Sequence, residues 1–271
     1  MADWSIIVWC NDRAVLQEYA LSFVSGYGQL GGHNVECVPI YPEEGCTCMG
    51  QAYKLGQERA HYPNRIYMHQ DVGLQDWSVL NKLEVMLDNP DIGGVGLIGS
   101  TVDVGSGYFH TPEHTWVGEK ATKDWVGIWA QTQEVKIVDG LFLATRLHLD
   151  WHTGYIGPHF TIEDACYQIR HRHHKQIWVM DTLFVHRGST YMDYTFYESL
   201  RKFRRRWRKQ IPPGSPSVAE LHARTELALD IAQEAVTAIP PTGEGFDEYI
   251  RKRMGGVLSK TGRANGPPAR K

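Results

Sequence analysis

Short apolar runs alternate with stretches of helical periodicity through the first part of the chain. The apolar runs predict strands at residues 5–10, 35–40, 65–68 and 94–98. Between these runs, apolar residues recur at helical spacing over residues 14–25, 49–60 and 77–87. Strands that alternate with helices in this order are typical of a mostly parallel sheet covered by helices on both faces. The pattern therefore predicts an α/β fold.

The second half of the chain ends in a helical region. Residues 134–138 lead into Asp139-Gly140 and the apolar run LFLAT, and a helix with two acids in its first turn is predicted from about residue 161. A basic helix then runs to the breaker PPGSP, and a capping-box pattern begins another amphipathic helix. We expect a sheet domain at 1–198, a helical C-terminal extension at 199–258 and a disordered tail at 259–271.

Composition narrows the class of protein. A chain of 271 residues that is 42% hydrophobic can bury one large core with an appendage. A net charge of −3 argues against a dedicated nucleic-acid binder, although residues 201–209 form a dense basic run that suits a local anionic partner. No apolar segment is long enough to span a bilayer, and five cysteines fit reduced thiols better than a disulfide framework. We therefore expect a soluble cytoplasmic protein.

Polar side chains stand at the ends of two predicted strands. Asn11-Asp12 follow the first strand, and His69-Gln70-Asp71 follow the third. In open parallel sheets, ligands bind beyond the carboxyl ends of the strands, where the connecting loops face one crevice. These two segments are therefore the first candidates for a binding site.

Three other patterns are weaker than they look. The glycines of residues 94–99 fit G-x-G-x-x-G, but they lie within a predicted strand and no helix follows, so a dinucleotide site is not expected. Cys46 and Cys48 have one residue between them and no second cysteine pair, which is poor spacing for zinc. His171 and His174 share a helix face without an acid or cysteine to complete a ligand set, and a solvated basic helix end explains them better.

Seven short segments occur in an order that identifies a family. They are CNDRAVL, AYKLG, MHQDV, GGVGLIGS, VDGLFLAT, IEDA and VHRGS. In this order the set resembles the family-two-like glycosyltransferases of the GT-A fold, most closely the branch related to the StrF protein of streptomycin biosynthesis. The resemblance covers roughly residues 5–195. It implies a Rossmann-like nucleotide-binding half and a transferase that uses a nucleotide sugar with Mn²⁺ or Mg²⁺.

The resemblance also assigns residues on the donor side. Asp71 would be the metal ligand, with His69 where an acid usually stands and Gln70 beside the donor. His186 falls where related enzymes place a histidine near the metal or the diphosphate, and it is the predicted second ligand, although a histidine that only packs or hydrogen-bonds at the sheet margin is the alternative. A hard cation suits this chemistry, since it stabilises the leaving diphosphate, and an imidazole ligand favours Mn²⁺.

Three further residues are assigned less directly to the donor. Asn11 and Asp12 match the loop that meets the base and the ribose in related enzymes. Lys54 stands where an asparagine is common, and either approaches phosphate or lies on a solvated helix face. UDP is the commonest donor nucleotide among the resembling enzymes.

The adjacent acids Glu163 and Asp164 correspond to the pair that supplies the general base in related inverting enzymes. A carboxylate must take the proton of the acceptor hydroxyl as that hydroxyl attacks the anomeric carbon. Asp164 is the predicted base, with Glu163 orienting it or binding acceptor, and Asp139 on the sugar or acceptor side. Without the resemblance, acids in a first turn simply complement the helix dipole.

The partner surfaces are the least defined part of the prediction. Trp116, Trp125 and Trp129 are a candidate platform for a glycan acceptor, and are equally suited to a core. The basic run 201–209 suits peripheral contact with an anionic membrane. A non-catalytic binder of nucleotide sugar or glycan on the same fold is the alternative function. The oligomeric state is left open.

Overall fold

The computed structural model describes residues 2–30, 32–101, 125–128, 132–186 and 194–211, together with 213, 215 and 217. The predictions for Trp116 and Trp129, for the helices beyond residue 217 and for the 259–271 tail lie outside these residues. Two compact units are distinguished, Met1–Val218 and Ala219–Lys271. Only the first unit is described below.

A seven-stranded sheet forms the centre of this unit, in the order β2-β1-β3-β10-β5-β11-β8. Strands β1, β2 and β3 are mutually parallel, as are β5 and β11, whereas β10 and β8 run antiparallel to their neighbours. The strands are β1 (Trp4–Trp9), β2 (Val35–Ile40), β3 (Asn64–His69), β5 (Ile92–Gly96), β8 (Gln133–Val135), β10 (Phe142–Thr145) and β11 (Gln176–Val179). The predicted mostly parallel sheet is confirmed.

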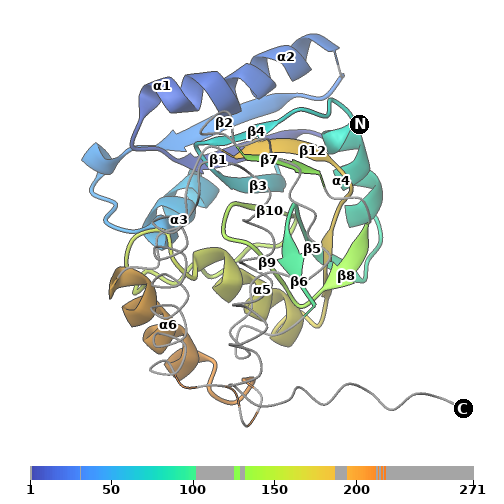
Figure 1. Cartoon of the computed structure of the whole chain (residues 1–271). Coiled ribbons are helices and arrows are strands. Elements are labelled where there is room, and N and C mark those ends of the chain that lie inside the picture. Colours follow the sequence, from blue (N-terminus) through green and yellow to red (C-terminus); the bar gives the residue numbers. More distant parts are fainter. Residues whose placement is uncertain are drawn as a thin grey trace, which may run out of the picture. The chain divides into compact units, whose positions relative to one another are not determined.

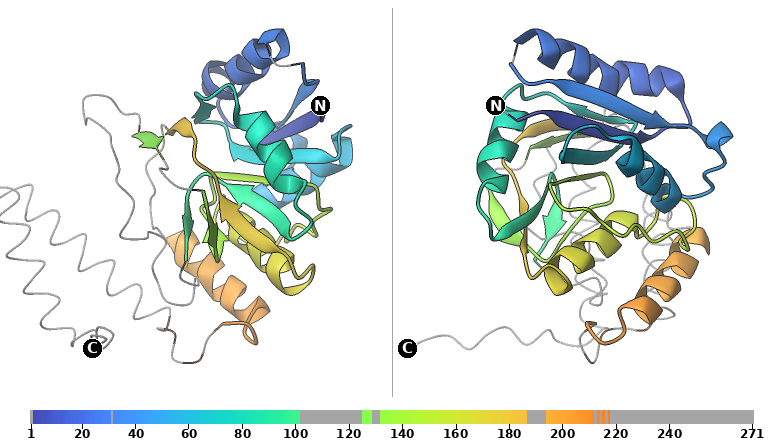
Figure 2. Two further views of the ribbon diagram at one scale, coloured as in Figure 1. Left: turned by 90° about the vertical axis from the view of Figure 1, so that its right-hand side faces the viewer. Right: turned by 180° about the vertical axis from the view of Figure 1, so that it is seen from behind.

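Helices cover both faces of this sheet (Figure 1, Figure 2). Alternate residues of β1 show why, because Ile6 and Val8 join the core beneath α2 and α4, while Ile7 faces α3. The helical elements are α1 (Arg13–Leu16), a π-helical turn (Gln17–Leu21), α2 (Ser22–Leu30), a 3₁₀ turn (Pro42–Glu44), α3 (Met49–Arg59), α4 (Val79–Leu87), α5 (Thr161–His171) and α6 (Tyr194–Arg206). The helix predicted over 14–25 therefore runs further, to Leu30, with a π-helical turn inside it.

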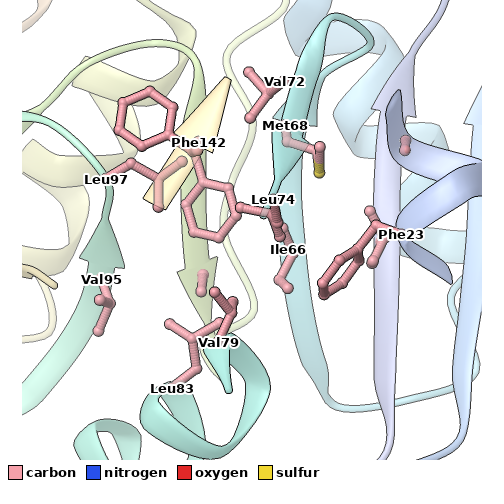
Figure 3. Close-up of a cluster of buried hydrophobic side chains, with 14 of the residues drawn as sticks. Phe23, Ile66, Met68, Val72, Leu74, Val79, Leu83, Val95, Leu97 and Phe142 are labelled. Atoms are coloured by element: carbon pink, nitrogen blue, oxygen red, sulfur yellow. The ribbon is translucent and has the colours of Figure 1, made fainter. Parts of the chain in front are cut away.

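A hydrophobic core lies between the sheet and the helices α2 and α4. Phe142 of β10, Ile66 of β3 and Leu83 of α4 meet there (Figure 3). The glycines of β5 serve the opposite face, since an added Cβ on Gly94 or Gly96 would collide with neighbouring side chains at 3.0 Å or less. These glycines permit close packing of the strand, which explains the misleading G-x-G-x-x-G pattern.

Two small sheets extend the central one at the end where β3 finishes. Strand β12 (Leu183–His186) lies between β4 (Val72–Leu74) and β7 (Trp125–Ile128), antiparallel to both. Strand β6 (Gly99–Ser100) pairs with β9 (Ile137–Val138). These short pairings bring segments that are distant in sequence to the carboxyl end of β3.

Helix α6 belongs to the first unit, so the boundary predicted at residue 198 falls inside a helix. Its apolar face is buried, with Phe203 fully enclosed and Leu200 and Trp207 nearly so. The helix lies beside α5 in every view (Figure 1, Figure 2). Among the described residues, no helix combines the length and the apolar character needed to cross a bilayer.

Candidate active site

The end of β3 meets the loop before β10. The His69 backbone N–H donates to the carbonyl of Leu141 at 3.0 Å, which fixes the end of the strand against the start of its antiparallel neighbour. Asp139 lies at the other side of that turn, where its N–H donates to Ile98 and its carboxylate accepts from the N–H of Leu141. The register of β3 and β10 thus brings Asp139 into the electrostatic reach of His69.

The pairing of β4 with β12 brings His186 to Asp71. In the register of β4 and β12, His186 lies opposite Val72, the residue after Asp71. Its Nε2 lies 3.5 Å from one carboxylate oxygen of Asp71, and His69 Nδ1 lies 4.0 Å from the other. One ligand atom from each of the three residues falls within 4.8 Å of the others. Within the described ranges, this is the one such group of histidine, cysteine and acidic side chains.

The donor set fits a divalent cation. His69 Nε2 is buried and has no hydrogen-bond partner among the described residues. Burial lowers the pKa of His69, so its imidazole is neutral at physiological pH and keeps a lone pair for a metal. Two imidazoles and a carboxylate are a combination that Mn²⁺ and its softer neighbours accept readily. His69 was predicted as a neighbour of the donor, and the geometry makes it a third candidate ligand.

Gln70 joins the two strand-end loops. Its side-chain carbonyl accepts from the backbone N–H groups of Asn11 and Asp12, both at 2.9 Å, and its amide donates to the side chain of Asn11. The carboxylate of Asp12 caps α1 by accepting from Ala14 N–H at 2.9 Å and from Val15 N–H. Gln70 and Asp12 thus shape the crevice edge through internal contacts, and Asn11 lies at that edge.

Neighbouring residues of α3 differ sharply in exposure. Lys54 is exposed, and no contact with the His69 cluster is found in the described part of the chain. Tyr53, by contrast, is fully buried, packs on Tyr67 and Trp151, and leaves its hydroxyl without a described partner. Burial raises the pKa of this hydroxyl, and the charges of Tyr67, Glu163 and Asp71 add to the rise. The sequence analysis missed Tyr53, although buried Ala52 and Gly56 on the same helical face could have indicated it.

Glu163 faces the turn at Asp139-Gly140. A Cβ added to Gly140 would lie 3.7 Å from Oε1 of Glu163, so the carboxylate stands directly over the glycine. Glu163 is 8% exposed, and its Oε2 has no hydrogen-bond partner among the described residues. Burial, together with the charge of Asp139, raises the pKa of Glu163 to about 8. This buried carboxylate therefore lies against the Asp139-Gly140 turn, and the next residue of that turn, Leu141, accepts a hydrogen bond from the His69 N–H.

Asp164, the predicted general base, lies among side chains of the protein itself. It is 1% exposed and accepts hydrogen bonds from Tyr155 at 2.8 Å, Trp207 at 2.6 Å and Gln168 at 2.8 Å. The guanidinium Nε of Arg206 completes an ion pair at 2.8 Å. A carboxylate has about four acceptor positions. Three of these contacts converge on Oδ1 and one reaches Oδ2, so protein groups engage both oxygens of this buried carboxylate.

The acceptor platform is described only in part. The backbone of Trp125 in β7 pairs with that of His186, which brings the strand carrying this tryptophan beside the metal-ligand cluster. The basic run 201–209 lies largely on α6 and divides into two groups. Arg206 and Lys202 are engaged with Asp164 and with the carbonyl of Gly154, whereas Arg205, Arg208 and Lys209 are exposed.

A protein-family model described as "Glycosyltransferase like family" matches residues 5–203. The chain belongs to this glycosyltransferase-like family. The predicted enzyme class and the family-two-like GT-A relationship are thereby confirmed, while the match does not distinguish a StrF-like branch. No curated protein sequence matches the chain.

Solved glycosyltransferases are similar to the chain at low sequence identity. One is a mutant of Drosophila β-1,4-galactosyltransferase 7 in complex with manganese, UDP-Gal and xylobiose, at 13% identity and a TM-score of 0.41, covering 70% of this chain and 72% of that one. Another is TarS of S. aureus, at 10% identity and a TM-score of 0.37, covering 74% of this chain and 64% of that one. Both scores are low, and membership of the family rests on the matched residues.

Proposed function

We propose that this glycosyltransferase moves a sugar from a nucleotide sugar, with UDP as the nucleotide, to an acceptor hydroxyl with inversion at the anomeric carbon. The observation that carries the proposal is the meeting of His69, Asp71 and His186 within 4.8 Å at the carboxyl end of a parallel strand. Ligands of open parallel sheets bind at such ends. Few purely structural roles call for two histidines and an acid converging there with a buried imidazole nitrogen left over.

The donor half of the site follows from these three side chains. His69, Asp71 and His186 would hold Mn²⁺ or Mg²⁺, and the two imidazoles favour Mn²⁺. When bound, the cation supplies Lewis-acid stabilisation of the charge that develops on the departing diphosphate. The chain's own residues orient the donor, with Asn11 at the edge of the crevice and Gln70 and Asp12 fixing that edge.

Asp139 and Lys54 were also predicted on the donor side, and the proposal gives them different weight. The charge of Asp139 acts to raise the pKa of both His69 and Glu163, which supports a place for Asp139 near the transferred sugar. Lys54 is exposed on α3 and serves the donor only if phosphate approaches from that side. Placement in the StrF-like branch and a cytoplasmic location remain predictions that rest on the sequence motifs and on the absence of a long apolar segment.

The test is metal-dependent release of nucleotide. Purified protein is incubated with UDP-glucose, UDP-galactose, UDP-N-acetylglucosamine and UDP-glucuronate, with Mn²⁺ or with a chelator, and UDP is quantified. Release that requires Mn²⁺, and that Asp71→Asn removes, is the expected result. Asp88→Asn is the matched control, because Asp88 is a surface acid whose partner Arg146 also binds Asn64, at the opposite end of β3 from His69. Release that is unchanged in Asp71→Asn would contradict the assignment of the donor site.

A further inference from the structure

The first turn of α5 carries two adjacent carboxylates in opposite environments. Successive helical residues point about 100° apart, so Glu163 and Asp164 cannot share a target. Resting on the proposed function, we propose that Glu163 is the catalytic base and that Asp164 is a positioning residue, through which α6 fixes the helix turn that carries Glu163. This reverses the roles that the sequence pattern suggests for the pair.

Asp164 has the properties of an anchor. Its two oxygens are occupied by Tyr155, Gln168, Trp207 and Arg206, and two of these partners come from the end of α6. The surrounding contacts are extensive, since Tyr167 packs on Phe203 and Trp207. Removing one partner of a buried ion pair is strongly unfavourable, so these contacts bind the first turn of α5 firmly to α6.

A second contact from α6 holds the same turn. Phe160, which precedes α5, adopts a left-handed conformation with φ 60°, which is unusual for a bulky residue without special support. Its ring is enclosed by Phe196 and Phe203 of α6, with centroids 5.0 Å and 5.5 Å away. Strained residues persist where the surroundings over-determine them, and they cluster at functional sites. Helix α6 and the residue after it therefore contact Phe160, which precedes Glu163, and Asp164, which follows it.

Glu163 has the opposite character. One oxygen is unpartnered among the described residues, and the carboxylate stands over Gly140, which has no side chain to cover it. The charge of Asp139 lies close by, and the buried hydroxyl of Tyr53 feels the charge of Glu163. A base whose pKa is raised toward the working pH is a stronger proton acceptor, and burial provides that here.

The transfer step balances with Glu163 as base. The acceptor O–H gives its proton to the Glu163 carboxylate, and the oxygen's electron pair forms the bond to the anomeric carbon. The bond from that carbon to the diphosphate oxygen breaks, and its electron pair leaves with the nucleoside diphosphate. Glu163 then returns the proton to solvent. No oxidant or further reactant is needed beyond the nucleotide sugar and the hydroxyl acceptor.

The experiment compares Glu163→Gln with Asp164→Asn in the full chain. Three quantities are measured for each: melting temperature, affinity for UDP with Mn²⁺ by calorimetry, and the kcat and KM of UDP release from the UDP-sugar that the wild type turns over. Asp150→Asn is the matched control, because Asp150 also contacts Arg206 but is 76% exposed at the surface. Glu163→Asp tests whether a shorter carboxylate restores part of the rate.

Glu163→Gln should keep the wild-type UDP affinity and lose at least about 100-fold in kcat, the usual range for removal of a general base. It should also lose the rise of kcat with pH that the wild type shows. Asp164→Asn should melt at lower temperature, lower kcat by roughly tenfold at unchanged UDP affinity, and retain that rise with pH, because Glu163 remains the titrating base.

Two results separate the failures. A wild type that binds no UDP with Mn²⁺ and releases none overturns the proposed function, and this inference with it. A wild type that turns over while Glu163→Gln keeps its kcat overturns the inference alone. Loss of the pH-dependent rise in Asp164→Asn with an unchanged melting temperature would also overturn it, because it would return the base to Asp164.

Discussion

The protein contains two clusters of polar side chains, one around Asp71 and one around Asp164, and they differ in how far protein groups satisfy their polar atoms. The cluster around Asp71 leaves ligand atoms unused, since His69 Nε2 has no described partner and the two histidines are aimed at one carboxylate. In the cluster around Asp164, by contrast, four side chains engage the two oxygens of one buried carboxylate. A buried polar atom without a protein partner is a candidate ligand atom, whereas a carboxylate that protein groups hold at both oxygens stabilises the fold.

The largest expected effect is a loss of stability at the Asp164 cluster. Asp164→Ala removes one partner of a buried ion pair and leaves Arg206 with only the exposed Asp150 as an acidic partner, and loss of such a partner typically costs about 3–5 kcal/mol. Denaturant unfolding of the chelated protein measures this loss. Asp150→Ala, at the exposed side of the same arginine, should stay within about 0.5 kcal/mol of wild type. Equal losses in the two variants would contradict the anchor role.

The next largest effect is expected on metal binding by the cluster of His69, Asp71 and His186. His69→Ala should weaken Mn²⁺ binding by at least about tenfold, because losing even an outer partner of a metal ligand costs that much. Its stability should change little without metal, since Nε2 has no partner to lose. Calorimetric titration with Mn²⁺ measures the affinity. His61→Ala is the control, because His61 is an exposed histidine that pairs with Glu36 away from the site. Unchanged Mn²⁺ affinity in His69→Ala would remove it from the ligand set.

A smaller effect concerns pH and Glu163. Its pKa is raised to about 8 in the folded chain from an ordinary value near 4.5, so the folded state holds a proton that the unfolded state releases between these values. Wild-type stability should therefore fall as pH rises from about 5 to 8, and Glu163→Gln should remove part of that fall. We expect the variant to melt roughly 2 °C or more above wild type at pH 8 in chelator, and close to it at pH 4. A variant that melts below wild type at pH 8 would contradict the buried, partly protonated carboxyl.

The smallest effect is expected on the solvent face of α6. Arg205, Arg208 and Lys209 are exposed, whereas Arg206 is committed to Asp164, so the former are the residues free to meet an anionic surface. Replacing these three by glutamine should reduce sedimentation with phosphatidylserine vesicles, by up to about 1 kcal/mol per residue. Binding should also weaken in high salt. Sedimentation that does not respond to the substitutions would rule out membrane contact through this face.

The sequence predicted the sheet because buried strands and amphipathic helices follow from local periodicity. The same reasoning located Asp71 and His69, since any polar residue just after a buried strand reaches the carboxyl edge. The ordered motifs added His186, whose contact with Asp71 depends on the β4–β12 register and cannot be read from either segment alone.

The roles within the acidic pair could not be predicted, because they depend on partners far away in the chain. Arg206 and Trp207 lie more than one element beyond Asp164, and a basic run near the end of a domain looks like a solvated face. Tyr53 is a different case. Its burial follows from the spacing of Ala52, Tyr53 and Gly56 on one face of α3 and could have been predicted from the sequence.

The most direct test of the central claim is the melting temperature of the protein with UDP, with Mn²⁺ and with both, for wild type, Asp71→Asn and Asp88→Asn. A ligand that binds only the folded state raises the melting temperature. We predict that UDP raises it only when Mn²⁺ is present, that Asp88→Asn behaves like wild type, and that Asp71→Asn loses the shift. A shift from UDP that needs neither Mn²⁺ nor Asp71 would contradict a metal-held diphosphate at His69, Asp71 and His186.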